Sequence, residues 1–368
     1  RARVRVPRPR PFKSSLGIQQ GSENAVVRVF TDSDLVGIGE ASSIWDRRGR
    51  GESETINGLL SEALVGFDPT QISSIRAHMD SLLHRSYPAK AGVEMALYDL
   101  VGKILDTPVY TLLGGQVRDR VLLSHSLSMG DPQDIVEQAK RLSEKGYKTL
   151  KCKVGRDHQS DLKILDAIRT EVGDITLRVD ANMGWSSAKE AVRRINELAA
   201  FNLELIEQPL HYSDMEGLAF VRSNVQVPIM ADESVWTPAD AMACIRANAV
   251  DVFNIYVSEA GGIGPAAQIF SIAEAARLPC IIGSMPELGI GTAAQAHRKM
   301  DNASVEGTIT MPPMMATAMT ATARPPKMAH LTKGEAPMGP LRLTPRRQVW
   351  PNTGGGLGVA RAAQDCAV

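Results

Sequence analysis

The sequence predicts an α/β protein in which a parallel β/α barrel follows a smaller α+β domain. Two observations carry this prediction. After about residue 120, seven short apolar runs alternate with amphipathic helical stretches at a period of roughly 22 to 30 residues. Before that point, β-like runs come first and helical patterns second. The alternation indicates a parallel sheet with right-handed crossovers. Because no glycine-rich dinucleotide motif follows any run, a closed barrel is favoured over an open doubly wound sheet.

The α+β domain is expected at residues 1–115. Apolar and β-branched residues alternate in three runs, with the turn Thr31-Asp-Ser-Asp34 before the last, as in an antiparallel meander. The runs are residues 4–6, 25–30 and 35–39. Three helical patterns follow, at residues 52–64, 72–83 and 89–105. In the third pattern, apolar side chains recur every three or four residues and mark one buried face.

The barrel is expected at residues 116–310. Its seven apolar runs are residues 121–124, 149–154, 175–179, 203–206, 227–230, 252–255 and 279–282. Helical stretches lie between them, at residues 132–145, 159–172, 187–199, 214–223, 238–247 and 263–276. An eighth strand at residues 305–309 is expected to close the ring.

The last segment, residues 311–368, is expected to pack back on the first domain. Residues 298–353 show little periodicity and include a run rich in Met, Thr, Ala and Pro. We interpret this stretch as a locally altered or frame-shifted coding sequence, or as residues that were wrongly assigned. Sequencing of the clone together with an intact mass tests both explanations.

Composition limits the partners of the chain. Lys plus Arg and Asp plus Glu both number 41, so the net charge is zero, and neither nucleic acid nor an anionic membrane is the expected partner. A small neutral or anionic metabolite fits better. The four cysteines lie far apart without metal-ligand spacing and are expected to be reduced residues of a cytoplasmic protein. No apolar run approaches the roughly 18 residues that a membrane helix needs.

Polar residues stand where four of the predicted barrel strands end. Lys151 and Lys153 close one strand, and Asp180, Glu207 and Asp232 follow the next three. Because the carboxyl ends of barrel strands meet at one mouth, these side chains are expected to converge. Three carboxylates form a hard oxygen-ligand set that suits Mg²⁺. A single Asp after a strand could equally cap a helix, but three at matched positions favour a metal. Strand alternation is expected to turn the competing ligand, Glu233, to the other face.

The two lysines are expected to share one face of their strand, with Cys152 on the other. Ammonium groups that point into a barrel are costly to bury without anions. Facing the carboxylates, one lysine can bind a substrate carboxylate, while the other loses its proton and acts as a base, since a nearby cation lowers its pKa. The alternative, two solvated lysines on an edge strand, fits poorly in the middle of a parallel barrel.

These motifs together resemble the enolase superfamily, and specifically its mandelate racemase and muconate lactonizing branch. The resemblance covers about residues 1–297. It rests on Lys151-Cys-Lys153, Asp180-Ala-Asn182 with Trp185, Ile206-Glu-Gln-Pro209, Ala231-Asp-Glu-Ser234, Asp251 with Gly261-Gly262, Ala96-Leu-Tyr-Asp-Leu100 and Leu112-Leu-Gly-Gly115.

The resemblance implies a modified (β/α)8, TIM-like barrel with an α+β capping domain, in a homo-oligomer. It implies one Mg²⁺ held by Asp180, Glu207 and Asp232. It also implies that Lys153 removes the proton α to a substrate carboxylate and that Lys151 contacts this carboxylate. A lysine or histidine base working with Mg²⁺ is the pattern of this superfamily.

One departure from the family pattern concerns the sixth strand, where Tyr256 stands in place of a second lysine. A phenol is a poor base at neutral pH but can donate a proton. Tyr256 is therefore either an acid or a packing residue at the barrel mouth. A one-base β-elimination of water, a dehydratase reaction, becomes the first expectation. The alternatives are a racemase or epimerase of an amino acid derivative, and a Mg²⁺-carboxylate binder without turnover.

Substrate contacts are the least specified part of the site. The segment Gly283-Ser-Met-Pro-Glu287 resembles relatives acting on proline, proline betaine and hydroxyproline, which favours dehydration of a hydroxyproline. The loops at residues 14–20 and 42–46 are expected to close over the barrel. Trp45, Asn182 and Glu287 are the candidate contacts. Trp45 could stack on a ring or cationic nitrogen, or pack at a hinge. Glu287 could instead support a residue that contacts the substrate, or be a rim residue.

Overall fold

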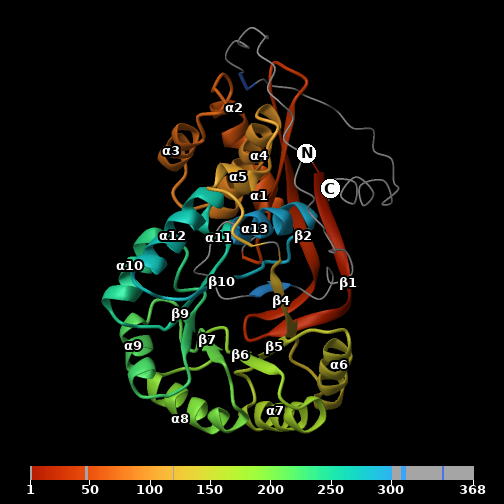
Figure 1. Cartoon of the computed structure of the whole chain (residues 1–368), viewed down its shortest axis with the longest axis vertical. Helices are drawn as coiled ribbons and strands as arrows, with labels where there is room; N and C mark the ends of the chain where they lie inside the picture. Colours follow the sequence, from red (N-terminus) through yellow and green to blue (C-terminus); the bar gives the residue numbers. More distant parts are fainter. Residues whose placement is uncertain (1, 46–48, 119, 301–307, 312–341, 344–368) are drawn as a thin grey trace.

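The computed structural model describes residues 2–45, 49–118, 120–300, 308–311 and 342–343, which form the two parts seen in Figure 1. A three-stranded antiparallel sheet with its helices forms the upper part, and a closed ring of parallel strands forms the lower part. The expected fold class, a β/α barrel with an α+β domain beside it, is confirmed.

The capping domain is built on a sheet with the strand order β1-β2-β3. Its strands are β1 (Ala2–Ser14), β2 (Gly17–Phe30) and β3 (Val36–Ala41). Its helical elements are α1 (Gly49–Thr55), the π-helical turn η1 (Ile56–Leu60), α2 (Ser61–Ala63), α3 (Ile72–Leu82), α4 (Tyr87–Ile104) and α5 (Val109–Leu112). Apolar side chains of the sheet and of helices α3 and α4 form a core separate from that of the barrel, with Val27, Ile75, Met79 and Leu97 among its members.

The β1–β2 hairpin is longer than the sequence indicated. We expected a short strand at residues 4–6 and a loop at 14–20, whereas β1 continues to Ser14 and the chain turns at residues 15 and 16. Prolines at positions 7, 9 and 11 concealed the strand, because a proline cannot donate to a β-ladder. β1 is an edge strand whose register shifts between Pro7 and Phe12, and both features accommodate prolines.

The tip of this hairpin is fastened to the barrel by hydrogen bonds. Ser15 Oγ donates to the carbonyl oxygen of Val154 at 3.0 Å, just after the second barrel strand. Lys13 N–H donates to Ser128 Oγ at 2.8 Å, and the Lys13 carbonyl accepts from Met129 N–H at 3.0 Å. A strand of the capping domain therefore forms part of the barrel mouth (Figure 1).

Strand β3 lies directly against helix α4 because two of its residues are glycines. A Cβ atom on Gly39 would stand 2.1 Å from the carbonyl oxygen of Gly92, and one on Gly37 would stand 2.0 Å from that of Ala96. Both contacts are to the helix backbone, which cannot rotate away as a side chain can. The two glycines thus set the distance between sheet and helix.

The barrel strands follow one another in chain order around the ring. They are β4 (Leu122–Leu127), β5 (Thr149–Lys153), β6 (Thr176–Asp180), β7 (Leu205–Glu207), β8 (Ile229–Ala231), β9 (Val252–Ile255), β10 (Cys280–Ile282) and β11 (Thr308–Met311). The helical elements between them are α6 (Pro132–Glu144), α7 (His158–Val172), α8 (Ala188–Leu198), η2 (Ala199–Phe201), α9 (Met215–Ser223), α10 (Pro238–Arg246), α11 (Val257–Ala260), α12 (Ile263–Ala275) and α13 (Gly289–Met300). Each of the seven apolar runs predicted from the sequence overlaps one of the strands β4 to β10.

Side-chain caps fix where the outer helices begin. The residue before each of helices α6 to α10 accepts a hydrogen bond from a backbone N–H of the first turn: Asp131, Asp157, Ser187, Asp214 and Thr237. Each cap satisfies a donor that the helix itself leaves free. The connections from strand end to helix start are thereby held in place around the mouth.

The closing strand β11 pairs with β4 at four positions and with β10 through Ile309 and Ile282. It overlaps the expected range of 305–309, of which residues 305–307 lie outside the described residues. From the expected C-terminal segment, Arg342 and Leu343 contact the capping domain. The Leu343 N–H donates to the carbonyl oxygen of Phe67 at 3.0 Å. The other residues of 312–368 lie outside the described part of the chain.

Buried polar contacts join the capping domain to the barrel. Glu40, at the end of β3, is fully buried and accepts from the backbone N–H groups of Leu288 at 2.6 Å and Gly291 at 2.9 Å. The Asn24 amide donates to Glu40 at 2.7 Å and to the carbonyl oxygen of Pro286 at 2.8 Å. Gly291, near the start of α13, therefore forms part of the junction between the two domains.

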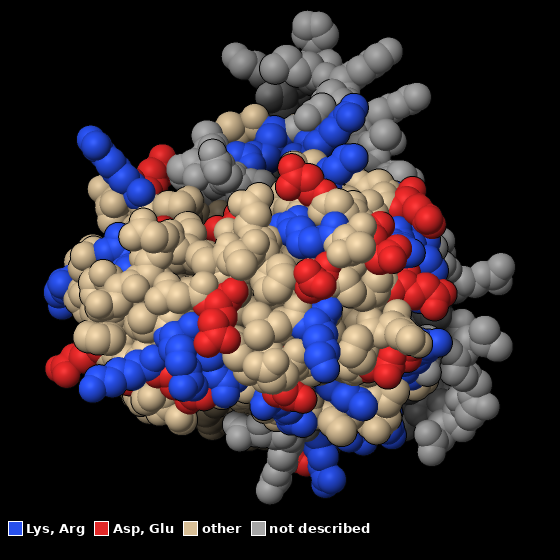
Figure 2. Space-filling model, turned by 90° about the horizontal axis from the view of Figure 1, so that it is seen from below, with Lys and Arg blue, Asp and Glu red and all other residues tan. Residues whose placement is uncertain are grey.

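The described cysteines lie in the core of the molecule, and its surface carries charges of both signs. Cys152, Cys244 and Cys280 are buried, as expected of core residues, and no disulfide joins them within the described ranges, whereas Cys366 lies outside the described residues. Figure 2 shows basic and acidic side chains interspersed on one face of the molecule, in keeping with the zero net charge. Within the described ranges, no helix combines the length and the apolar character needed to span a bilayer.

Candidate active site

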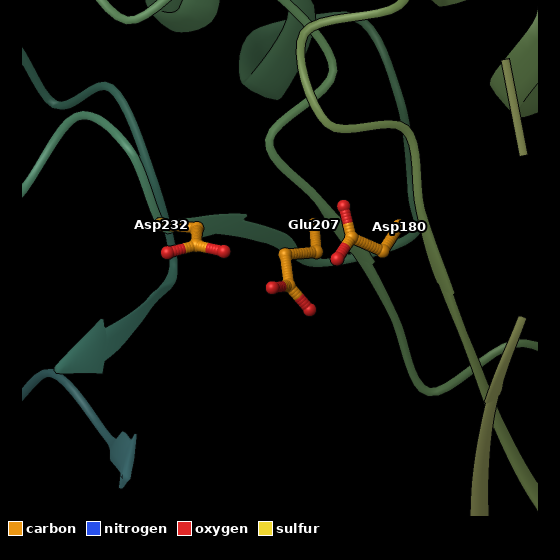
Figure 3. Close-up of side chains that lie close together, drawn as sticks. All are labelled: Asp180, Glu207 and Asp232. Carbon is orange, nitrogen blue, oxygen red and sulfur yellow. The ribbon is translucent and has the colours of Figure 1, made fainter. Parts of the chain in front are cut away.

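Three carboxylates converge at the carboxyl ends of neighbouring strands (Figure 3). Asp180 is the last residue of β6, Glu207 is the last residue of β7, and Asp232 follows β8 directly. Asp180 and Glu207 are register partners, so their side chains leave the sheet side by side. All three are buried, and one oxygen from each lies within 4.8 Å of the others. The convergence predicted from strand ends is observed.

The donor set of this cluster suits a hard divalent cation. Three buried carboxylates concentrate negative charge in a region from which water is largely excluded, and such charge is costly without a cation. Carboxylate oxygens are the ligands that Mg²⁺ prefers, usually with further positions left for water or substrate. The residues present therefore fit an oxygen-ligated divalent cation.

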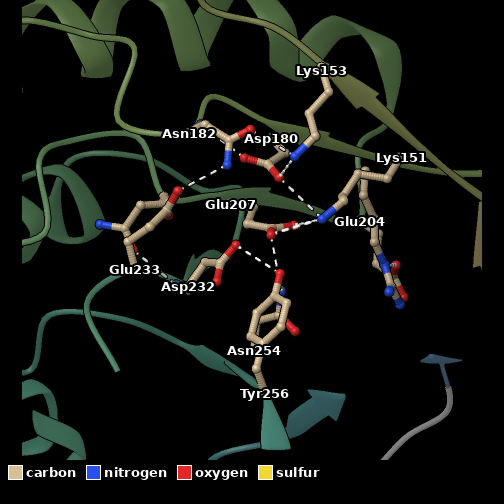
Figure 4. Close-up of polar contacts among 12 residues, drawn as sticks. Lys151, Lys153, Asp180, Asn182, Glu204, Glu207, Asp232, Glu233, Asn254 and Tyr256 are labelled. Carbon is tan, nitrogen blue, oxygen red and sulfur yellow. Dashed lines mark hydrogen bonds and ion pairs between the residues drawn. The ribbon is translucent and has the colours of Figure 1, made fainter. Parts of the chain in front are cut away.

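Both predicted lysines point at the carboxylates (Figure 4). Lys151 Nζ lies 2.8 and 2.7 Å from the two oxygens of Glu207 and 3.1 Å from Asp180 Oδ2. Lys153 Nζ lies 2.5 Å from the same Asp180 oxygen. The ammonium groups thus act as the internal counter-ions of the cluster.

The carboxylates and lysines shift one another's pKa values. Burial alone would lower the pKa of Lys151, but the carboxylates of Glu207, Asp180 and Asp232 outweigh it and raise that pKa above its usual range. Burial likewise opposes ionisation of Asp180, yet Lys153 and Lys151 hold the pKa of Asp180 well below its usual range. Lys151 is therefore a protonated lysine, the form that binds a carboxylate.

Asn182 links Lys153 to the next carboxylate along the mouth. Its Oδ1 accepts from Lys153 Nζ at 2.7 Å, and its Nδ2 donates to Glu233 Oε1 at 3.0 Å. Its backbone has a φ of 42°, and its N–H donates to Asp180 Oδ1 at 2.8 Å. This local turn aims the amide at Lys153.

The expectation that Glu233 faces away from the site is wrong. Glu233 is buried and lines the same pocket as Lys153 and Asn182. The alternation argument fails because β8 ends at Ala231, so Glu233 lies in the turn after the strand. It remains outside the group of three carboxylates whose oxygens converge.

Tyr256 lies just past β9, the sixth barrel strand, as the sequence predicted. Its hydroxyl donates to Asp232 Oδ2 at 3.1 Å and accepts from Asn254 Nδ2 at 3.1 Å, while the same amide donates to Glu207 Oε1 at 3.0 Å. Burial, followed by the charges of Asp232 and Glu207, raises the pKa of Tyr256 well above its usual value. The phenol is therefore protonated and can act as a proton donor.

The ring of Tyr256 can occupy this position because Gly283 has no side chain. A Cβ on Gly283, just after β10, would stand 2.2 Å from the Tyr256 ring and 2.6 Å from Asn254 Oδ1. The sequence contained this glycine in the segment 283–287, but its role depends on a neighbouring strand.

A pocket of about 630 Å³, its open entrance included, lies over these residues. Its floor comes from the barrel and one wall comes from the β1–β2 hairpin and the loop after β3. The lining residues are Arg8, Phe12, Ser14, Leu16, Gln19, Ile44, Trp45, Ser126, Lys151, Lys153, Asn182, Asp232, Glu233, Tyr256, Glu259, Ser284, Met285 and Pro286. Both regions expected to cover the site, at residues 14–20 and 42–46, contribute to it, although Asp46 lies outside the described residues.

Trp45 lines this pocket, whereas Glu287 does not. The Trp45 indole N–H donates to Glu259 Oε1 at 2.8 Å. Glu287 stands behind the wall, where it accepts from Ser284 Oγ at 2.6 Å and from Gln295 Nε2 at 2.8 Å. Burial raises the pKa of Glu287 to about 8. Glu287 thus supports Ser284 rather than reaching the space in which a substrate would lie.

Two charged residues on the pocket wall did not emerge from the sequence. Glu259 lies in the single-turn helix α11, a position that an inspection of strand ends passes over. Arg8 lies on the concealed part of β1, with its guanidinium 4.9 Å from the centre of the Phe12 ring. Burial lowers the pKa of Arg8 to about 10, so it remains a cation. Arg8 and Arg10, which alternate with the prolines of β1, were the available signal.

Comparison with protein families finds two matches along the chain. Residues 1–114 match the model described as "Mandelate racemase / muconate lactonizing enzyme, N-terminal domain", and residues 134–340 match "Enolase C-terminal domain-like". Together they cover most of the chain.

Individual relatives fall into three classes of activity. An N-succinyl-L-Arg/Lys racemase from Bacillus cereus is 34% identical over 300 residues, which are 80% of this chain and 81% of the relative. A muconate cycloisomerase from Acinetobacter lwoffii is 34% identical, covering 80% and 79%. Among solved structures, the dipeptide epimerase of Enterococcus faecalis in complex with Mg and the dipeptide L-Leu-L-Tyr has a TM-score of 0.80 at 36% identity, covering 84% of this chain and 88% of that one.

Proposed function

Because the chain belongs to the mandelate racemase/muconate lactonizing enzyme family of the enolase superfamily, we propose that it is a Mg²⁺-dependent racemase or epimerase of an amino acid derivative or dipeptide. The chain is an enzyme of this superfamily, whose relatives here are racemases, epimerases and cycloisomerases. None of these relatives is a dehydratase, so the first expectation, dehydration of a hydroxyproline, receives no support from them.

The observation that carries the proposal is the placement of a base and an acid around one pocket. Lys153 and Tyr256 both line the pocket, and they stand on opposite sides of the carboxylate cluster in Figure 4. A substrate carbon held between them can lose a proton to the lysine on one face and gain a proton from the phenol on the other. Inversion at that carbon is the result.

The remaining residues position the substrate for this transfer. Lys151, kept protonated by its carboxylate neighbours, binds and polarises the substrate carboxylate. Asn182 holds the Lys153 ammonium at 2.7 Å through its side-chain oxygen and so orients the amine toward the pocket. The hairpin wall, with Phe12 and Leu16, excludes water from the reacting carbon.

We assign Asp180, Glu207 and Asp232 as the ligands that hold Mg²⁺. A bound Mg²⁺ stabilises the negative charge that develops on the substrate carboxylate oxygens when the α-proton leaves. The weak acidity of such a proton makes this stabilisation necessary.

Exchange of the α-proton tests the proposal directly. Dipeptides and N-succinyl amino acids are incubated with the protein and Mg²⁺ in D₂O, and α-deuterium is followed by NMR while chiral chromatography separates the epimers. We expect deuterium at the α-carbon and formation of the opposite epimer, and a Lys153→Ala variant should lose about 10²- to 10⁴-fold in rate. Absence of exchange with every substrate of both classes would contradict the proposal.

β-Elimination of water is the second candidate, and the protonated phenol of Tyr256 is the observation that favours it. In this reaction Lys153 takes the α-proton, the C–O bond at the β-carbon breaks, and Tyr256 protonates the departing hydroxyl. Incubation of 3-hydroxyprolines in D₂O separates the candidates. An epimerase returns deuterated hydroxy acid, whereas a dehydratase releases the hydroxyl as water and forms a cyclic imine that no longer carries it.

A further inference from the structure

Glu259 is a buried charged residue to which the proposed proton transfer gives no role. It lies in α11, three residues after Tyr256, and it lines the pocket although its exposed fraction is only 2%. One carboxylate oxygen, Oε1, accepts from the Trp45 indole at 2.8 Å. The other oxygen, Oε2, has no hydrogen-bond partner among the described residues.

A buried carboxylate with one unsatisfied oxygen is costly unless a cation approaches it. The two lysines of the site do not provide one, because their ammonium groups contact Asp180, Glu207 and Asn182. Burial, followed by the carboxyl groups of Glu233 and Glu287, raises the pKa of Glu259 well above its usual value, so a cation beside Oε2 would favour its ionised form. This side of the pocket therefore attracts a positive group from outside the protein.

The neighbouring indole favours the same kind of group. Trp45 lines the pocket beside Glu259, and the face of an indole attracts cations through its quadrupole. Its ring also packs against Trp236, with centroids 5.8 Å apart, which fixes its orientation. A carboxylate oxygen and an aromatic ring thus form a prearranged corner of the pocket.

We propose that Glu259, together with Trp45, binds a positively charged nitrogen of the substrate, which selects amino acids or peptides with a free amine over their N-acylated forms. The inference rests on the proposed function, since the same pocket must hold the reacting carboxylate beside Lys151. The substrate is then a zwitterion whose carboxylate lies at the lysines and whose ammonium lies at α11. This assignment separates the chain from an enzyme for N-succinyl amino acids.

Matched pairs of probes test the inference. L-Alanyl-L-alanine and L-proline are each compared with the N-acetyl form, on the full-length protein with Mg²⁺ at pH 8. Calorimetry gives the dissociation constants, and α-deuterium exchange in D₂O gives kcat and KM. We expect the wild type to bind at least one free amine about tenfold or more tightly than its N-acetyl partner, a ratio typical of a hydrogen bond to a charged group.

Variants of Glu259 test whether this residue causes the preference for a free amine over its N-acetyl form. Glu259→Gln should reduce the ratio of amine to acetyl affinity to less than about threefold, mainly through KM, because the amide keeps its contact with Trp45 but carries no charge. Glu259→Asp keeps the charge and should retain part of the ratio. The exposed Glu274→Gln on α12 is the control that should leave it unchanged.

The outcomes distinguish this inference from the proposed function. Equal binding of amine and acetyl forms by the wild type, or no binding of either free amine, overturns the inference whether or not the variants fold. An unchanged ratio in Glu259→Gln overturns it as well. Selective amine binding without any α-exchange would instead contradict the proposed function and leave Glu259 as the ammonium site.

Discussion

Tyr256 is the residue on which the direction of proton transfer depends. A lysine pair can exchange roles as acid and base easily, because an amine near its pKa is available in both forms. A buried phenol beside Asp232 is held in its protonated form, so it is a far better donor than acceptor. The site is therefore expected to be asymmetric, with exchange fastest for the epimer whose proton faces Lys153.

Replacement of Tyr256 by Phe should separate the two half-reactions. Loss of the hydroxyl removes the proton donor, so formation of the opposite epimer should fall about 10²- to 10⁴-fold. Exchange of the proton that faces Lys153 should continue, because the lysine keeps its contact with Asp180 at 2.5 Å. NMR in D₂O and chiral chromatography on the same sample report the two quantities. Equal loss of both would mean that Tyr256 is not the acid.

Removal of the Lys151 charge should change the Mg²⁺ affinity in the opposite direction to removal of a carboxylate charge. Its ammonium lies within 3.1 Å of Glu207 and Asp180, so a divalent cation at the cluster must share those oxygens with it. Removing this competing charge by Lys151→Met should raise the Mg²⁺ affinity about tenfold, a change of about 1.4 kcal/mol. Calorimetric titration without substrate measures this.

The companion variant Asp232→Asn controls that measurement. It removes a carboxylate charge and should weaken Mg²⁺ binding roughly 10- to 100-fold or more. Weaker Mg²⁺ binding by Lys151→Met as well would show that the lysine organises the carboxylates rather than competing for them.

Among the elements, the contact between β3 and α4 is the most sensitive to added volume. Gly39→Ala would place a methyl group 2.1 Å from the carbonyl oxygen of Gly92, so strand and helix must move apart. We expect the free energy of unfolding to fall by about 1–3 kcal/mol or more. Urea unfolding followed by circular dichroism measures the change. The exposed Gly130→Ala, with no atom within 4 Å of the added Cβ, should stay within about 0.5 kcal/mol of the wild type.

Sequence patterns defined the elements better than they defined the ends of the elements. The polar residues at the ends of β5, β6 and β7 and directly after β8 were recognised because each closes an apolar run, and the structure brings them together. Glu233 was misplaced because a strand of three residues ends before the alternation reaches it. The length of β1 was missed because its prolines lie on an edge strand, where the ladder tolerates them.

Contacts between distant segments were beyond the reach of local patterns. Trp45 and Glu259 are 214 positions apart, and neither residue type in its own segment indicates the other. The same holds for Gly283, whose absent side chain makes room for a tyrosine on the preceding strand. Periodicity records which face of an element is buried, but it does not record what lies opposite that face.

At the scale of the whole molecule, buried carboxyl groups connect the two domains. Glu94 on α4 accepts from the backbone N–H of Gly264 on α12 at 3.1 Å, and Glu40 accepts from two N–H groups at the start of α13. Burial raises the pKa of Glu94 to about 7 and also raises the pKa of Glu40. The joined domains therefore bind protons that the unfolded chain releases at lower pH.

This difference predicts how stability depends on pH. Between pH 4.5 and pH 7 the folded state holds a proton on Glu94 more tightly than the unfolded state, so the contribution of Glu94 to stability is greatest below pH 4.5 and is lost as the pH rises toward 7. Glu94→Gln keeps an acceptor for Gly264 but does not titrate. The difference in urea midpoint, variant minus wild type, should therefore increase from pH 5 to pH 8.

The comparison with the variant is needed because other groups titrate in the same range. Burial lowers the pKa of His125 to about 4, which makes its own contribution grow with pH. That contribution is common to wild type and variant and cancels in the difference. A pH-independent difference would mean that Glu94 titrates normally in the folded protein.

The long β1–β2 hairpin also has a consequence for how this enzyme can diversify. The groups assigned to proton transfer and metal binding all belong to barrel strands and the turns after them, whereas Arg8, Phe12, Leu16 and Gln19 reach the same pocket from the hairpin. The residues assigned to the reaction and the residues of the hairpin wall are therefore encoded by separate stretches of the gene. Mutations confined to the codons of residues 8–19 can present a new wall to new substrates while the descendants keep the ancestral reaction.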